Sequence, residues 1–326
     1  MQDERYEARR QLITKIAWLY YKNGFTQQQI ADHLGTSRLR VIKLLAAALE
    51  EGIVRITVTS PYVEAFELEK QLCAIFGLNE AVVVPKLDQP DDLRRAIGGM
   101  AASYLERILT NSDILGTAWG QTVLEAARQL HPPKKLPDLL LVQLMGGFRD
   151  SSGSENPLDI AQVIAEKYHS RYLNLFAPAI VDNSDIRDIL LSDQGIKRVI
   201  ETARRATKAL VGIGSASDNS TLAKTGFAGS DILRGLTAKG AVGDIVGRFY
   251  NIDGCPIESD LDSRTISIEL ESVRQIPCVI GLAGGPNKVE AILGALRGNY
   301  LKILITDEET AAAVIRLNNL ISDPRG

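Results

Sequence analysis

Short apolar runs alternate with amphipathic helical stretches from residue 80 to the C-terminal region, and this alternation constrains the fold more than any other feature of the sequence. Apolar runs bounded by turn residues are typical of buried strands, whereas apolar residues spaced three and four apart are typical of helices. A strand, a helix and a second strand in succession form a unit whose two strands are parallel. The pattern therefore predicts an α/β domain built on a doubly wound parallel sheet.

Strands and helices are expected in turn along this domain. The expected strands lie at residues 81–84, 114–115, 139–145, 172–176, 209–213, 241–250, 265–270, 278–282 and 301–306. The expected helices lie at residues 91–109, 122–130, 158–168, 193–207, 230–239, 287–297 and 308–318. Sheets of this kind bind ligands at the carboxyl ends of their strands, so the loops that directly follow strands are the candidate binding loops.

Four loops at predicted strand ends carry glycine together with polar side chains. The first, residues 116–122, offers glycines, two threonine hydroxyls and the start of a helix, whose free N–H groups favour an anion. Lys288 follows a Gly-Gly pair at the start of another helix, which suits a phosphate, and Asp244 suits a sugar hydroxyl. The residues predicted to bind a ligand are Gly116, Thr117, Ala118, Trp119, Gly120, Gln121, Thr122, Gly146, Gly147, Phe148, Asp244, Gly284, Gly285 and Lys288.

Each of these residues also has a purely structural explanation. A Gly-Gly pair before a helix is common turn chemistry, Asp244 could cap a helix or pair with a basic neighbour, and Trp119 could belong to the core. Several such loops at the strand ends of one domain favour a ligand site over these explanations. None of the loops has the spacing of a Walker loop or of G-x-G-x-x-G, so a nucleotide is not indicated.

The first 50 residues predict three short helices arranged as a helix-turn-helix. Residues 9–21 carry apolar side chains at helical spacing. Thr26, followed three residues later by Gln29, forms a capping box that starts a second helix, and Ser37 can cap a third. Between them, Gly35 tolerates the positive φ of a tight turn. Two helices joined by a turn of this length pack at a steep angle.

Basic side chains gather at the start of the third helix, the part of a helix-turn-helix that enters the major groove of DNA. Arginine can bind guanine with two hydrogen bonds, and lysine or serine can hold phosphates. A three-helix bundle with a solvated basic face is the alternative interpretation. The predicted DNA contacts are Thr26, Gln27, Ser37, Arg38, Leu39, Arg40 and Lys43.

A domain boundary is expected near Pro61. Residues 53–58 have the apolar pattern of a strand, as the wing of a winged helix-turn-helix would, and Ser60-Pro61 ends it. We therefore expect a winged helix-turn-helix DNA-binding domain at residues 1–60 and an effector-binding and oligomerisation domain at residues 61–326. An amphipathic helix at residues 63–76 would pack on the second domain or contribute to subunit contacts.

The net charge of −3 hides a basic first domain and an acidic second one. Residues 1–60 contain nine lysines and arginines against six acidic residues, whereas the remainder contains 28 against 34. A basic module on an acidic body favours a polyanionic partner at one end. Three scattered cysteines, three scattered histidines, a charged N-terminal segment and no long apolar run predict a cytoplasmic protein with no metal site, no cofactor and no membrane contact.

Together these segments resemble the SorC family of bacterial transcriptional regulators over nearly the whole chain. The residues that carry the resemblance lie in segments 14–21, 26–31, 52–56, 116–122, 243–249 and 283–298. The resemblance implies a winged helix-turn-helix joined to a sugar-phosphate-binding domain similar in fold to glucosamine-6-phosphate deaminase and ribose-5-phosphate isomerase. It also implies homodimers or homotetramers. Carried over by motif, the 116–122 loop and Lys288 would hold the phosphate and Asp244 a sugar hydroxyl.

Two functions from different classes are compatible with this sequence. The favoured one is a DNA-binding regulator, a repressor of a carbohydrate or polyol operon, whose binding to operator DNA responds to a phosphorylated sugar or polyol. The alternative is a sugar-phosphate isomerase or deaminase with an accessory N-terminal helical module, which would need a general base beside the ligand. Because an enzyme has no use for Arg38, Arg40 and Lys43 on a capped helix, we expect a regulator without catalytic residues.

Overall fold

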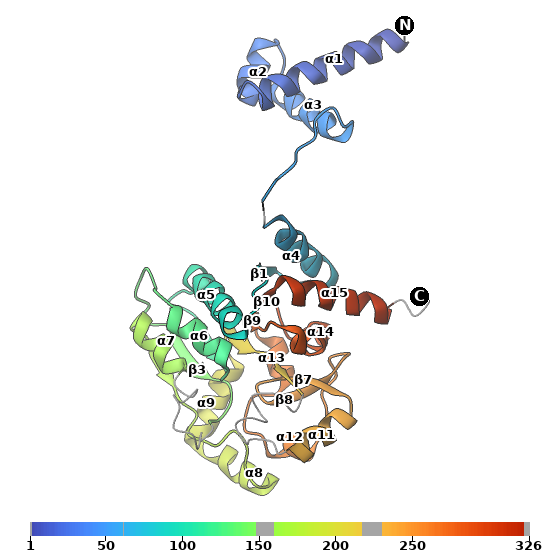
Figure 1. The fold of residues 1–326 in the computed structure, drawn as a ribbon. Helices are drawn as coiled ribbons and strands as arrows, with labels where there is room; N and C mark the ends of the chain where they lie inside the picture. Colours follow the sequence, from blue (N-terminus) through green and yellow to red (C-terminus); the bar gives the residue numbers. More distant parts are fainter. Residues whose placement is uncertain (1, 61, 148–159, 217–229, 323–326) are drawn as a thin grey trace. The chain divides into compact units, whose positions relative to one another are not determined.

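The computed structural model describes residues 2–60, 62–147, 160–216 and 230–322. The chain forms two compact units, Met1–Pro61 and Tyr62–Gly326 (Figure 1). In its described residues the first unit is helical, and the second combines two β-sheets with helices.

Three helices make up the first unit: α1 (Gln2–Tyr21), α2 (Gln27–His33) and α3 (Arg38–Glu50). The expected capping box is present, since the Gln29 N–H donates to Thr26 Oγ1 at 3.2 Å and the Thr26 N–H donates to Gln29 Oε1 at 2.9 Å. The Arg40 N–H donates to Ser37 Oγ at 3.3 Å, so Ser37 caps α3. Apolar side chains from all three helices share one core: Ile16, Leu19, Ile30, Ala31, Val41 and Leu45.

The strand expected at residues 53–58 is not formed, so this unit lacks the predicted wing in its described residues. A turn is followed there by an irregular segment, in which Ile56 and Val58 are largely exposed. Ile53 and Val54 instead pack against a small core formed by α1 and α3, and the Val54 N–H donates to the Ala48 carbonyl at 2.9 Å. A strand needs a hydrogen-bonded partner strand, and an apolar alternation without one does not form a sheet.

A seven-stranded parallel sheet is the centre of the second unit, as the sequence predicts. Its strands lie in the order β1-β10-β9-β5-β2-β3-β4, and every pairing between neighbours is parallel. Chain order and strand order diverge between β2 and β5, which makes this the topological switch point. The strands are β1 (Glu80–Val84), β2 (Ile114–Thr117), β3 (Leu140–Gln143), β4 (Arg171–Leu173), β5 (Lys208–Gly212), β9 (Cys278–Leu282) and β10 (Ile303–Asp307).

Helices cover both faces of this sheet (Figure 1). Alternate residues of a strand point to opposite faces, so Leu210 of β5 joins the core shared with α5, α6 and α7. Its neighbours Ala209 and Val211 join the core shared with α4, α9, α14 and α15. The helices are α4 (Val63–Phe76), α5 (Pro90–Ile108), α6 (Gln121–Gln129), α7 (Ile160–Tyr168), α8 (Ser184–Ser192), α9 (Gln194–Arg204), α11 (Ser230–Ala238), α12 (Asp260–Arg264), α13 (Leu270–Gln275), η2 (Pro286–Lys288), α14 (Val289–Arg297) and α15 (Glu308–Ser322).

Two predicted strands of the parallel sheet are wrong. Residues 241–250 form an antiparallel hairpin, β7 (Ala241–Ile245) and β8 (Arg248–Asn251), in a separate sheet with β6 (Gly214–Ser215). The hairpin turns at Val246 and Gly247, both with positive φ, and a valine gives no sequence signal for such a turn. Residues 265–270 make only isolated bridges, so their apolar pattern reflects burial rather than a strand.

Candidate functional site

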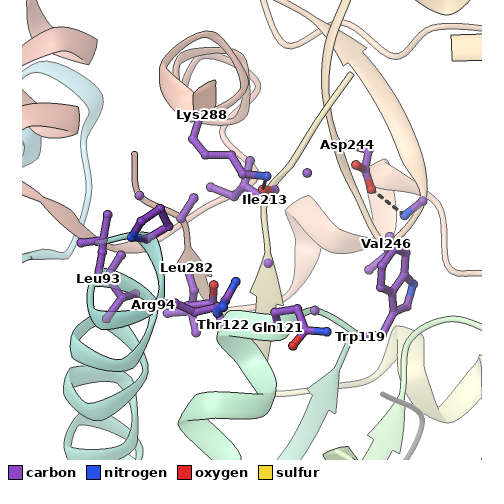
Figure 2. A pocket seen from close by; sticks show the side chains of 18 of the residues that line it. Leu93, Arg94, Trp119, Gln121, Thr122, Ile213, Asp244, Val246, Leu282 and Lys288 are labelled. Atoms are coloured by element: carbon purple, nitrogen blue, oxygen red, sulfur yellow. Dashed lines mark hydrogen bonds between the residues drawn. The ribbon is translucent and has the colours of Figure 1, made fainter. Parts of the chain in front are cut away.

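A cavity of about 230 Å³ opens at the carboxyl ends of β2, β5 and β9, where the strand order reverses. Parallel sheets bind ligands at this place because loops from both halves of the sheet diverge there. The cavity is lined by the N-terminal turns of α5 and α6, the segment after β5, the turn before α14 and the β7–β8 hairpin (Figure 2). With Met145, which follows β3, the site is therefore assembled from six segments that are far apart in the sequence.

Asp244 is the buried acid of this cavity. Its side chain is 5% exposed, and the Gly247 N–H donates to its Oδ2 at 3.2 Å. Its other oxygen, Oδ1, is buried and has no hydrogen-bond partner among the described residues. Burial raises the pKa of Asp244 to about 6, although the charge of Lys288 and the Gly247 N–H act in the opposite direction. A buried acceptor without a partner is costly in a folded protein.

Lys288 is one of two basic residues that line the cavity; the other is Arg94. Figure 2 shows the Lys288 side chain reaching from the turn before α14 toward Ile213, whose carbonyl oxygen accepts a hydrogen bond from Nζ at 2.8 Å. Burial lowers the pKa of Lys288, and the negative charge of Asp244 works against this shift. One Nζ–H bond is directed to a backbone carbonyl, and an ammonium group has two further donors for a ligand.

The start of α6 contributes backbone donors. Trp119, Gly120, Gln121 and Thr122 line the cavity, and Gly120 takes the N-cap position without a side-chain cap. The first N–H groups of a helix have no partner within the helix and carry partial positive charge. Together with Lys288, this helix end gives the cavity two features that attract an anion.

The wall formed by α5 is not predicted from the sequence. Pro90, Leu93, Arg94 and Ile97 line the cavity from its first turns, and Arg94 is ion-paired with Asp91. The loop before α5, residues 85–89, contains no glycine and therefore lacks the feature that marks the predicted binding loops. The sequence does predict a strand followed by a helix here. Because β1 is parallel to the other strands, its carboxyl end lies at the edge of the sheet where the cavity opens, and this could have indicated the start of α5 as part of the site. Other missed lining residues are Met145, Gly212, Ile213, Gly214, Val246, Gly247, Leu282 and Ala283.

Seven of the predicted ligand residues line the cavity: Trp119, Gly120, Gln121, Thr122, Asp244, Gly284 and Lys288. Of the others, Phe148 lies outside the described residues, and the six described ones do not line the cavity: Gly116, Thr117, Ala118, Gly146, Gly147 and Gly285. Thr117 and Ala118 are buried beside Gly116 at the end of β2. The amides of Gly146 and Gly147 donate to the carbonyls of Ile266 and Ala177. The amide of Gly285 is held by Asp307 and Thr310.

The predicted DNA contacts lie on α2, α3 and their N-caps. Ser37, Arg38, Leu39, Arg40 and Lys43 are exposed, and Leu39 is 63% exposed despite its apolar side chain. The Arg38 Nε donates to Gln27 Oε1 at 3.4 Å, which links the start of α3 to α2. Thr26 is exposed at the start of α2, and Gln27 is half-buried. The arrangement presents two arginines on the first turn of α3.

Within the described residues, no helix is long and apolar enough to cross a membrane. A family model for sugar-binding domains, Sugar-bind, matches residues 60–316. The sorbitol operon regulator of Klebsiella pneumoniae is 35% identical over 310 residues, which are 94% of this chain and 98% of the relative. The chain belongs to the SorC family of transcriptional regulators.

Other SorC-family relatives lead to the same class of protein. The deoxyribonucleoside regulator of Bacillus subtilis (strain 168) is 35% identical over 311 residues, which are 94% of this chain and 98% of the relative. The crystal structure of full-length SorC from Klebsiella pneumoniae matches with a TM-score of 0.72 and 33% identity, covering 94% of this chain and 98% of that one. The similarity to these regulators extends over nearly the whole length of each relative. The chain is therefore a transcriptional regulator rather than an isomerase or deaminase.

Proposed function

We propose that this SorC-family regulator represses a carbohydrate or polyol operon and that a phosphorylated sugar or polyol bound in the cavity controls its binding to operator DNA. In this proposal residues 1–60 bind DNA and residues 61–326 bind the effector and form the oligomer. The names of relatives support the operon class, since they include regulators of sorbitol, deoxyribonucleoside and erythritol genes. The protein would act in the cytoplasm as a homodimer or homotetramer, because helix-turn-helix proteins commonly bind paired half-sites.

One observation carries the proposed effector class: Lys288 and the uncapped start of α6 line the same cavity as the buried acid Asp244. Lys288 and the uncapped start of α6 suit the phosphate, and Asp244 Oδ1 suits a sugar hydroxyl. A cavity of about 230 Å³ is close to the lower end of small-molecule sites, which fits a short-chain sugar phosphate better than a nucleotide. The effector would shift the DNA-binding equilibrium by binding one conformation more tightly than another.

The chain's two tryptophans provide the test. Trp119 lines the cavity, whereas Trp18 lies on α1 with 56% of its surface exposed. In a Trp18→Phe chain, fluorescence reports Trp119 alone. We expect phosphates of tetroses, pentoses, hexoses and their polyols to be ranked by fluorescence titration, with at least one binding far more tightly than its unphosphorylated parent. Lys288→Ala should lower that affinity more than tenfold, because a partly buried cation is removed from an anion site.

Matched controls decide the outcome of this titration. Lys239→Ala removes a lysine whose Nζ donates to the Glu258 carbonyl outside the cavity lining, so effector affinity should not change. DNA binding by Lys288→Ala should stay intact. An equal affinity for a phosphorylated sugar and its parent, or turnover of the sugar phosphate at enzymatic rates, would contradict the proposed function.

A further inference from the structure

The turn that carries Lys288 is fastened to the start of the last helix by a buried hydrogen-bond cluster. The Gly285 N–H donates to Asp307 Oδ2 at 2.9 Å and to Thr310 Oγ1 at 2.8 Å. Thr310 in turn donates its hydroxyl to Asp307 Oδ2 at 2.6 Å and its N–H to Asp307 Oδ1 at 3.0 Å. Asp307 and Thr310 are 3% and 1% exposed, so water does not compete for these bonds. The cluster joins three elements, since Asp307 ends β10 and Thr310 lies in the first turn of α15.

The same turn lines the effector cavity and also neighbouring grooves. Gly284 and Lys288 line the effector cavity. Pro286 and Val289, in the same short segment, line a second groove of about 510 Å³, whose other walls come from α4 and α15. A movement of this turn therefore changes the shape of both cavities.

Helix α4 is packed against the elements that this turn contacts. Its Ala65 and Leu72 are buried in the core that also contains Ala311 and Val314 of α15, and α4 lies beside α15 in Figure 1. Leu68 of α4 lines the second groove with Val289. Because α4 is the first helix of the second unit, a displacement of α4 reaches the chain segment that leads back to the DNA-binding unit.

We propose that Asp307 and Thr310 are positioning residues that couple occupancy of the effector cavity to α4. This inference rests on the proposed function, because it assigns a route to the regulation of that site. A bound anion accepts from the two further Nζ–H donors of Lys288 and draws the ammonium, with the turn that carries it, toward the ligand. The buried cluster makes α15 follow the turn instead of letting the loop move alone. Packed elements with two discrete arrangements transmit such displacements.

Thr310→Val tests this coupling, because valine keeps the shape of threonine and removes its hydroxyl. The background is the Trp18→Phe chain, and the probe is inorganic phosphate at millimolar concentration. Trp119 fluorescence measures occupancy of the cavity, and amide hydrogen exchange measures the response of residues 63–76. We expect phosphate to change the exchange of α4 in the background chain. Thr310→Val should bind phosphate within about threefold of that chain and lose the α4 response, whereas Thr310→Ser should keep both.

Two failures are distinguishable. An α4 response that survives in Thr310→Val, or that is missing in the background chain although Trp119 reports binding, overturns the coupling and leaves the proposed function standing. A Trp119 signal that responds to neither phosphate nor any sugar phosphate overturns the proposed function and the coupling with it. If Thr310→Val does not fold, Asp307→Asn serves in its place, because an amide has one acceptor oxygen where the carboxylate has two and so cannot accept from both the Gly285 N–H and the Thr310 N–H.

Discussion

At the scale of single residues, Asp244 shows how close packing leaves one carboxylate oxygen without a hydrogen-bond partner among the described residues. A Cβ atom at Gly214 would lie 1.7 Å from Asp244 Oδ1, so this strand pairing requires glycine opposite the acid. The acid is buried, carries one hydrogen bond from a backbone amide and has one oxygen without a partner. The folded protein therefore bears the cost of desolvating the charged form, and binding of a hydroxyl donor would recover part of it.

The raised pKa of Asp244 predicts a pH-dependent cost in stability. Burial raises the folded-state pKa to about 6 from the model-compound value of 3.8. The folded state then binds more protons than the unfolded state between these values, so the contribution of Asp244 to stability falls as pH rises through that window. Asp244→Asn removes the titration. The free energy of unfolding is measured for both chains by urea unfolding, followed by Trp119 fluorescence, at pH 5 and pH 7.5. Relative to the wild type, the variant should be more stable at pH 7.5 than at pH 5 by about 1 kcal/mol. A difference that is constant across this range would contradict the raised pKa.

At the scale of secondary-structure elements, the sequence predicts correctly the features that depend on contacts between residues close together in the chain. It does not predict those that depend on long-range packing. Helices α2 and α3 begin where their caps predict, because capping is a contact between residues three apart, and α4 follows its apolar spacing as far as Gly77. The β7–β8 hairpin was missed because Val246 has a φ of 50°, a conformation rare for a β-branched residue, and long-range packing imposes it. The cavity shows the same dependence. Its glycine-rich loops can be predicted from the sequence, whereas the contribution of α5 depends on how distant segments pack.

The first turn of α3 gives a prediction for DNA binding. Arg38→Ala and Arg40→Ala should each weaken specific binding by about 5- to 150-fold, which corresponds to the 1–3 kcal/mol of a base-reading arginine. The DNA is a fragment selected by the wild-type protein from a random library, and affinity is measured by fluorescence anisotropy. Lys15→Ala is the matched control, because it removes one exposed positive charge from α1 outside the predicted contacts. Should both arginine variants match Lys15→Ala in affinity, the assignment of α3 as the recognition helix is wrong.

At the scale of the whole molecule, two compact units with separate ligands must obey thermodynamic linkage. If an effector lowers the affinity for the selected DNA by some factor, saturating DNA must lower the affinity for the effector by the same factor. Coupling of 1–3 kcal/mol is typical, which corresponds to about 5- to 150-fold. Trp119 fluorescence in the Trp18→Phe chain measures the affinity for the effector with and without DNA. Anisotropy of labelled DNA measures the affinity for DNA with and without the effector.

We expect the two factors to be equal. In Thr310→Val both factors should approach a value of one, meaning no coupling, while the protein still binds both DNA and effector. The reason is that the variant removes two of the four hydrogen bonds of the cluster, those of the Thr310 hydroxyl, and so weakens the joint between the cavity turn and α15 while leaving Lys288, Asp244 and α3 in place. Unequal factors would mean that DNA and effector do not act on a common equilibrium of one molecular species. Equal factors that persist in Thr310→Val would place the coupling in another part of the second unit, with the turn and α15 moving independently.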